Sequence, residues 1–318
     1  MVVYTGLALF AGAGGLELGL KRALAANGDR YKCVAYVERE ASSAAVLATN
    51  MERPESGLDK GVIWDDVTTF TGDVVSPFVD RIDIVSAGFN CQPWSYAGSR
   101  KGAEDDRYLW PNIAEILGTI HPEWAFFENV PGLLRGGLGP ILSDLTSLGF
   151  GQIEWTSVRA NDERIGAPHK RERLFILAHA DNARSPAPGS GVNRIGSQED
   201  ERREEQPQLE STGSGEQLVN PVGKRGRGWH TGGEYAEHAF PPGPSASAEW
   251  RDILSQRPDL APAIEPEVRG VVDGVSRGLA RTQQLRILGN GVVPQQAALA
   301  FQILKERIDG STTTSKQH

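Results

Sequence analysis

The feature that most constrains the fold is a series of short apolar segments, each ending at a glycine or a carboxylate. Helical periodicity follows the first two of them, over Leu16–Ala25 and Ala41–Asn50. Short buried strands separated by helices predict right-handed βαβ units, and therefore an α/β fold with a mostly parallel, doubly wound sheet. The predicted strands are Tyr4–Phe10, Cys33–Val37, Ile82–Ala87 and Trp124–Phe127.

The carboxyl ends of parallel strands meet at one edge of a sheet, where α/β proteins place their chemistry. The polar residues that follow the predicted strands, or lie in the loop after one, are therefore candidates for a shared site. They are Gly12, Glu38, Asp66, Cys91 and Glu128.

Composition limits the class of protein. The 318 residues are 39% hydrophobic and 23% charged, which suits a large α/β domain with a smaller second one. The two cysteines, Cys33 and Cys91, exclude a disulfide framework or a cysteine-based zinc site and favour an intracellular compartment. No apolar run approaches the ~18 residues that cross a bilayer, and we expect no membrane association and no metal site.

A change in composition near Asp181 divides the chain. Pro, Gly, Ser, Glu and Arg then dominate, and large apolar residues are scarce, which is typical of partly disordered segments. We expect a main domain at 1–179, a partly disordered insert at 180–265, a return to the main domain at 266–308 with a final helix over Gln295–Ile308, and a tail at 309–318.

The segment Gly12-Ala13-Gly14-Gly15 lies between a predicted strand and a predicted helix. Glycines let the backbone approach a ligand closely, although a purely structural turn has the same composition. The spacing is not the G-x-G-x-x-G of dinucleotide sites, and Glu17 in the first helical turn would repel a pyrophosphate. A cofactor without phosphates fits better, with Glu38 placed where a ribose-binding carboxylate would lie. This spacing argues against a nucleotide-dependent oxidoreductase.

The two cysteines differ in their surroundings. Cys91 lies in a polar loop between Gly88 and Pro93, an accessible setting in which a thiolate can act as a nucleophile. Cys33 lies inside an apolar strand and is interpreted as a small buried hydrophobe.

Glu128 ends the apolar run Trp124–Phe127, so burial should raise the pKa of its carboxyl group and suit it to general acid chemistry. A helix cap or a surface glutamate is the alternative interpretation. Arg171 and Arg173 are spaced to share one face of a strand, either at a site or as a solvated basic edge.

Five segments in order resemble the motifs of the cytosine-C5 DNA methyltransferases of bacteria and phages. The resemblance implies an S-adenosylmethionine-dependent methyltransferase of Rossmann-like fold. Asn90, Trp94 and His169 differ from the residues that the family usually has at those positions, which are Pro, Phe and Gln. The five segments are Phe10–Gly15, Gly88–Ser95, Glu128–Val130, His169–Arg173 and Leu288–Pro294.

Roles for single residues follow from this resemblance. Cys91 would attack C6 of cytosine, Glu128 would donate a proton or hydrogen bond at N3, and Arg173 would hold O2. Arg171, counted with these catalytic residues, would set a phosphate or the loop. Glu38 would bind the ribose hydroxyls, and Asp66 the adenine amino group, with Asp65 as the neighbouring alternative. The implied cofactor-binding residues are Phe10, Gly12, Ala13, Gly14, Gly15, Glu38, Asp66, Asn290 and Val292.

The resemblance also implies double-stranded DNA as the partner, a flipped-out target cytosine and a target-recognition domain in the insert. Residues 1–150 carry 12 Lys and Arg against 19 Asp and Glu, whereas residues 151–318 carry 21 against 22, so an anionic partner should meet the second part. The expected DNA-binding residues are Ser95, Arg100, Lys224, Arg225 and Arg227. A monomer in the cytoplasm of a bacterium or phage-infected host is expected, and a restriction endonuclease for the same site is the further partner considered.

Two alternatives belong to the same family. An RNA cytosine-C5 methyltransferase would have shorter insertions, so the long insert favours DNA. A catalytically weak DNA-binding homologue is suggested by Asn90 alone.

Overall fold

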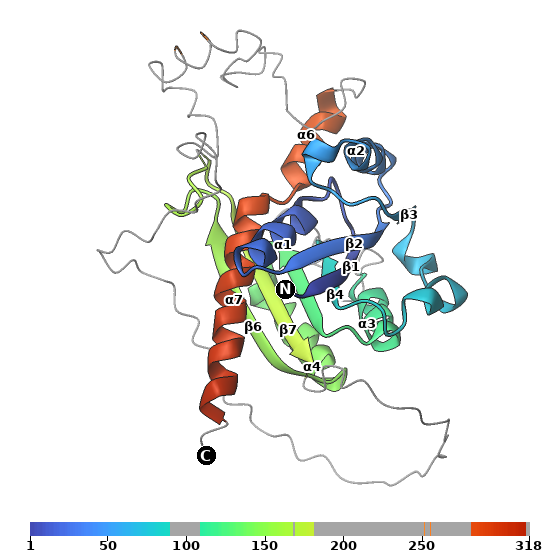
Figure 1. The fold of residues 1–318 in the computed structure, drawn as a ribbon, viewed down its shortest axis with the longest axis vertical. Helices are drawn as coiled ribbons and strands as arrows, with labels where there is room; N and C mark the ends of the chain where they lie inside the picture. The colour runs from blue at the N-terminus through green and yellow to red at the C-terminus, as the bar shows by residue number, and fades with distance from the viewer. Residues whose placement is uncertain (90–108, 168, 181–250, 252–254, 256–280, 316–318) are drawn as a thin grey trace. The chain divides into compact units, whose positions relative to one another are not determined.

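The computed structural model describes residues 1–89, 109–167, 169–180, 251, 255 and 281–315 (Figure 1). Seven strands form one sheet, and helices lie on both of its faces. The strands are β1 (Val3–Leu9), β2 (Arg30–Val37), β3 (Val62–Trp64), β4 (Ile84–Ala87), β5 (Trp124–Asn129), β6 (Phe150–Arg159) and β7 (Glu172–Ala180). The helices are α1 (Gly15–Ala26), α2 (Ala41–Met51), α3 (Trp110–Ile120), α4 (Leu138–Ser147), α6 (Arg281–Asn290) and α7 (Pro294–Ser315).

The strands lie in the order β3-β2-β1-β4-β5-β7-β6. All pairs from β3 to β5 are parallel, whereas β7 runs antiparallel to both β5 and β6. This confirms the predicted α/β fold with a mostly parallel, doubly wound sheet.

Two hydrophobic cores sandwich the sheet. On one face, α1 and α7 pack over inward-facing residues such as Ala8 and Phe126. On the other face, α3 and α4 cover residues such as Val85 and Phe127. Alternate residues of each central strand therefore enter opposite cores, and both faces of the strands are apolar, as expected for a buried parallel sheet.

The sheet has a switch point between β1 and β4, because the chain moves outward from β1 through β2 to β3 and then returns to β4 on the other side. Ligands of open α/β sheets bind outside the carboxyl ends of the strands at such a point. The antiparallel strand β7 begins at this same edge, since Leu174 pairs with Asn129 at the end of β5. The topology thus brings the start of β7 to the edge where β1, β4 and β5 end.

The predicted strands and the first two predicted helices are confirmed to within a few residues at their ends. The sequence analysis did not identify β3, β6, α3, α4 or α6, and the predicted final helix is confirmed as α7, which extends to Ser315, past the predicted end at Ile308. The insert predicted at 180–265 lies almost entirely outside the described residues. None of the helices in the described part has the length and apolar character that a membrane crossing requires.

Candidate active site

The glycine turn after β1 leaves open space beside its backbone. Gly12 and Gly14 have positive φ angles of 56° and 84°, and Phe10 adopts a left-handed φ of 55°. A Cβ at Gly14 would lie 2.7 Å from the Leu58 side chain, so glycine is required there by packing. A Cβ at Gly12 would meet no atom of the described residues within 4 Å. The space beside Gly12 is therefore open to a ligand.

Glu38, just after β2, ties the two strand ends together. One carboxylate oxygen accepts a hydrogen bond from the Gly12 amide and the other from the Glu40 amide, each at 2.7 Å. Burial raises the pKa of the Glu38 carboxyl, and the two amide bonds oppose that rise. The half-buried carboxylate therefore lies at the glycine turn.

Asp66 begins a short turn after β3. Its Oδ1 accepts hydrogen bonds from both the amide and the hydroxyl of Thr68, which lower the pKa of the carboxyl group. Arg39 lies 3.7 Å from Oδ2. Two carboxyl groups thus follow β2 and β3 beside the turn that ends β1, and these acceptors fit the hydroxyl and amino groups of an adenosine moiety better than a phosphate.

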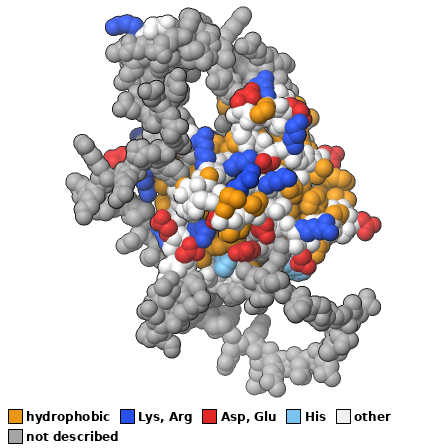
Figure 2. Space-filling view, in the orientation of Figure 1, with side chains coloured by type: hydrophobic (Ala, Val, Ile, Leu, Met, Phe, Trp, Pro, Cys, Tyr) orange, Lys and Arg blue, Asp and Glu red, His pale blue; other side chains and the backbone are white. Residues whose placement is uncertain are grey.

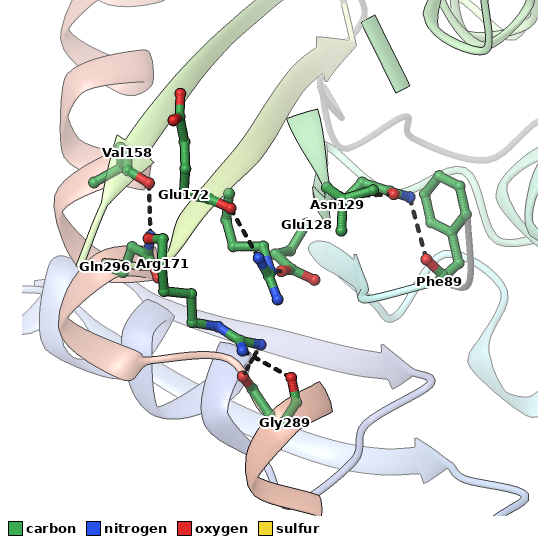
Figure 3. Close-up of polar contacts among 11 residues, drawn as sticks. Phe89, Glu128, Asn129, Val158, Arg171, Glu172, Gly289 and Gln296 are labelled. Atoms are coloured by element: carbon green, nitrogen blue, oxygen red, sulfur yellow. Dashed lines mark hydrogen bonds and ion pairs between the residues drawn. The ribbon is translucent and has the colours of Figure 1, made fainter. Parts of the chain in front are cut away.

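Glu128, labelled in Figure 3 at the end of β5, forms an ion pair with the partly buried Arg173 at the start of β7. Arg173 Nε lies 2.8 Å from Glu128 Oε1, and Glu128 is 7% exposed. Burial raises the pKa of the Glu128 carboxyl, although Arg173 and Arg171 both act to lower it. Arg173 also donates to the Glu172 carbonyl at 2.8 Å, which fixes the guanidinium. The result is a carboxyl group whose pKa lies above its usual range and whose position is fixed by a cation.

Asn129 connects the end of β5 to the stem of the cysteine loop. Its amide donates to the Phe89 carbonyl at 3.1 Å, while its carbonyl accepts from the Val130 amide at 2.8 Å. The Phe89 ring packs on Trp110 and Phe127, with centroids 5.7 Å and 6.2 Å away. Residues 90–108 are thus bounded by Phe89 and by α3, which begins at Trp110, and the two aromatic rings are in contact.

Arg171, one residue before β7, faces away from the ion pair. Its guanidinium donates to the carbonyls of Gly289 and Gly291, at 2.7 Å and 2.6 Å. Gln296 of α7 donates to the carbonyls of Arg171 and Val158, at 2.7 Å and 2.6 Å. Figure 3 shows this network beside the Glu128–Arg173 pair. The two arginines of the predicted pair therefore contact different parts of the molecule.

The structure brings three pairs of predicted residues together: Gly12 with Glu38, Glu128 with Arg173, and Gly15 with Val292. In the third pair, the Val292 carbonyl lies where a side chain at position 15 would be. Asn290 is exposed at the end of α6. Cys33 is a buried, free thiol in β2, as predicted. Cys91, Ser95, Arg100, Lys224, Arg225 and Arg227 lie outside the described residues.

The sequence analysis did not identify Asn129 or Gln296 as positioning residues. Gln296 is fully buried, and a polar residue on an otherwise apolar helical face was the signal that could have singled it out. No group of three or more candidate metal ligands occurs among the residues that the model describes. On the face shown in Figure 2, the Lys and Arg side chains of the described part are interspersed with Asp and Glu.

Comparisons with known proteins place this site in context. The model of the C-5 cytosine-specific DNA methylase family matches residues 4–236. Type II methyltransferase M.Eco47II of Escherichia coli is 36% identical over 181 residues, covering 55% of this chain and 39% of the relative. Type II methyltransferase M.NgoMIV of Neisseria gonorrhoeae is 37% identical over 180 residues, covering 55% and 51%.

Solved structures show a more distant likeness. The S. pombe Dnmt2 methyltransferase matches with a TM-score of 0.44 and 22% identity, covering 56% of this chain and 51% of that one. The chain matches only about two fifths to one half of the length of the curated relatives given above.

Proposed function

The chain belongs to the C-5 cytosine-specific DNA methylase family, and we propose that it transfers a methyl group to C5 of a cytosine in a specific double-stranded DNA sequence. The single observation that carries the proposal is the buried Glu128–Arg173 pair at the switch-point edge of the sheet. Glu128 of this pair directly precedes Asn129 at the end of β5. The Asn129 amide donates to the carbonyl of Phe89, the last described residue before the loop that contains Cys91.

The methyl donor is S-adenosylmethionine, which supplies an electrophilic sulfonium methyl group when bound. The open turn at Gly12 and the adjacent Glu38 carboxylate fit its phosphate-free adenosine moiety. We assign the ribose hydroxyls to Glu38 and the adenine amino group to Asp66. The rest of the pocket is assigned to Phe10, Gly12, Ala13, Gly14, Gly15, Asn290 and Val292.

Carbon C5 of cytosine is a poor nucleophile, and the proposed roles address that barrier. The Cys91 thiolate adds to C6, which turns C5 into an enamine carbon able to attack the methyl group. Glu128 donates a proton or a strong hydrogen bond at N3, and burial, which raises the pKa of its carboxyl group, favours the protonated form. Arg173 stabilises the negative charge that develops at O2. A water-borne base then takes the C5 proton, and the electron pair of that C–H bond re-forms the C5–C6 double bond and expels the Cys91 thiolate by β-elimination.

The target base has to leave the duplex to reach these groups, at a cost of a few kcal/mol of unpairing and unstacking. We assign sequence recognition to the insert at 180–265, with Lys224, Arg225 and Arg227 as base or phosphate contacts, and loop contacts to Ser95 and Arg100. We propose that the chain acts as a monomer in the cytoplasm of a bacterial or phage-infected cell. A restriction endonuclease for the same DNA sequence is its proposed partner.

Bisulfite sequencing of plasmid DNA from methylation-free cells expressing the chain tests the proposal. We expect protected cytosines at one recurring short sequence. Cys91→Ala is the matched control, and it should abolish protection while S-adenosylmethionine binding, measured calorimetrically, is retained. A different outcome would be unprotected DNA from cells that express the wild-type chain, combined with tritium transfer from the labelled donor to tRNA. That outcome would show that the substrate is RNA and not DNA. Protection by the Cys91→Ala variant would refute the role of the thiolate.

A further inference from the structure

On the side of the catalytic strands, the Arg171 side chain holds the turn between α6 and α7. Both terminal nitrogens of Arg171 are used, one for the Gly289 carbonyl and one for the Gly291 carbonyl. These carbonyls lie at the C-terminal end of α6, where helix carbonyls lack intrahelical partners and a cation is favoured. The Gly291 amide closes the turn by donating to the Ile287 carbonyl at 2.7 Å.

On its other side, the turn lies directly against the glycine turn of the candidate donor pocket. The Val292 carbonyl occupies the position that a Cβ at Gly15 would take. One helical turn later, a Cβ at Gly19 would lie 2.5 Å from the Ala297 side chain and 2.8 Å from the Pro294 carbonyl. The start of α7 therefore approaches α1 at backbone distance, and a shift of the turn would move the wall of the pocket.

Gln296 fixes the backbone from which Arg171 projects. Its buried amide nitrogen bridges the carbonyls of Val158 on β6 and Arg171, while its own helix, α7, continues from the turn. Three elements thus meet at one amide group. The Arg171 guanidinium has a defined origin as well as two defined acceptors.

We propose that Arg171 is a positioning residue for the methyl-donor pocket, acting by holding the Gly289–Val292 turn against α1 rather than by contacting the cytosine or a DNA phosphate. The inference rests on the proposed function, because it assumes that this pocket holds S-adenosylmethionine. A planar guanidinium fork can reach two carbonyls at once, whereas a lysine ammonium offers one compact charge. Lysine at position 171 should therefore retain the positive charge and release one side of the turn.

The test compares Arg171→Lys with Arg159→Lys, a matched control. Arg159 is an exposed arginine of the neighbouring strand, and its partner is Glu172. We expect Arg171→Lys to weaken S-adenosylmethionine binding about 10- to 100-fold in calorimetry without DNA, the range for one lost hydrogen bond from a charged donor. The turnover number at saturating donor should change by less than about threefold, since the pair that does the chemistry is intact. The control should match the wild type in both measurements.

Hydrogen exchange gives a readout that is independent of activity. The Gly291 amide and its peptide should exchange faster in Arg171→Lys than in the wild type and in Arg159→Lys. Near-UV circular dichroism checks the fold, and Arg171→Gln repeats the test should the lysine variant be unfolded.

Two results for Arg171→Lys would overturn the inference. The first is unchanged hydrogen exchange at the turn. The second is a lower turnover number with unchanged donor affinity, because that would mean that Arg171 contacts the substrate. The wild-type chain could bind no S-adenosylmethionine while its turn still exchanges more slowly than the turn of Arg171→Lys. That result would refute the proposed function but would support the role of Arg171 in holding the turn.

Discussion

Two buried glutamates, one in α1 and one at the end of β5, show how differently the molecule treats the same side chain. Glu128, at the end of β5, is 7% exposed and lies 2.8 Å from the Arg173 guanidinium. Glu17, in the first turn of α1, is 3% exposed, and its only hydrogen-bond donor among described side chains is the Ser86 hydroxyl, at 2.9 Å. Its Oε2 has no hydrogen-bond partner in the described part of the chain.

Burial raises the pKa of both carboxyl groups, to about 7 for Glu17. The difference lies in the partner. A cation beside Glu128 stabilises the charged form and opposes the effect of burial on its pKa, and it holds the carboxyl group in place. Among the described residues, the groups that lower the pKa of Glu17 are its own backbone amide and the Ser86 hydroxyl, with no cation among them, so its charged form is a cost to the fold. A raised pKa therefore does not by itself identify a catalytic carboxyl group, and its surroundings have to be considered.

The largest expected effect comes from replacing the catalytic member of the comparison. Glu128→Gln keeps the shape and a hydrogen-bond donor but removes the transferable proton, and we expect methyl transfer to slow about 10²- to 10⁴-fold. Donor binding should stay within about twofold of the wild type, because Glu38 and the glycine turn are untouched. Single-turnover tritium transfer measures the first quantity and calorimetry the second; a retained rate would exclude Glu128 as the acid.

Removing the cation should make Glu128 resemble Glu17. Arg173→Met leaves a buried carboxyl group without a charged partner on β7, so the pKa of Glu128 should rise further. We expect a loss of about 10²- to 10³-fold in turnover, as for removal of one donor to a developing negative charge. Arg159→Met is the control, because its ion pair with Glu172 is exposed. A pH–rate profile in which the limb due to Glu128 does not move upward would contradict the expected pKa shift.

Glu17→Gln should affect stability and not chemistry. The pKa of Glu17 rises from about 4.5 in the unfolded chain to about 7 in the folded one, so the folded state binds more protons between these values. The free energy of unfolding therefore falls as the pH rises from about 4.5 to 7, by roughly 3 kcal/mol, and the penalty is complete above pH 7. We expect the variant to gain roughly 2–3 kcal/mol more at pH 8 than at pH 5 in urea unfolding. Equal gains at both pH values would show that the Glu17 charge is not the cause.

The smallest effect is expected from the hydroxyl group beside Glu17. Ser86→Ala removes the donor that partly compensates the buried carboxylate, and we expect a loss of about 1 kcal/mol in the free energy of unfolding at pH 8. In the Glu17→Gln background the same substitution should cost less, because the acceptor is then neutral. A double-mutant cycle measures the difference, and a coupling of zero would mean that the 2.9 Å contact contributes nothing.

The central part of the fold was accessible from the sequence because its strands are apolar on both faces. The edge strand β6 was missed because only three of its ten residues are buried, and β3 was missed because it spans three residues. The glycine turn and Glu38 were found from local spacing. The Glu128–Arg173 contact was not, because it depends on the antiparallel register of β5 and β7. The same limit applies to the Arg171–Gly289 bond, which joins residues 118 positions apart.

The antiparallel direction of β7 also constrains any redesign of the chain. The strand starts at the edge that holds Glu128 and ends at Ala180, whose amide bonds to the Glu123 carbonyl at the opposite edge. The helix α6, in contrast, lies beside α2 (Figure 1), where Arg286 is 3.1 Å from Glu40. A shortened chain that joined Ala180 directly to Arg281 would have to cover the length of the nine-residue strand, about 30 Å. Any replacement for the segment between Ala180 and Arg281, for example one taken from a relative, therefore needs at least about nine extended residues.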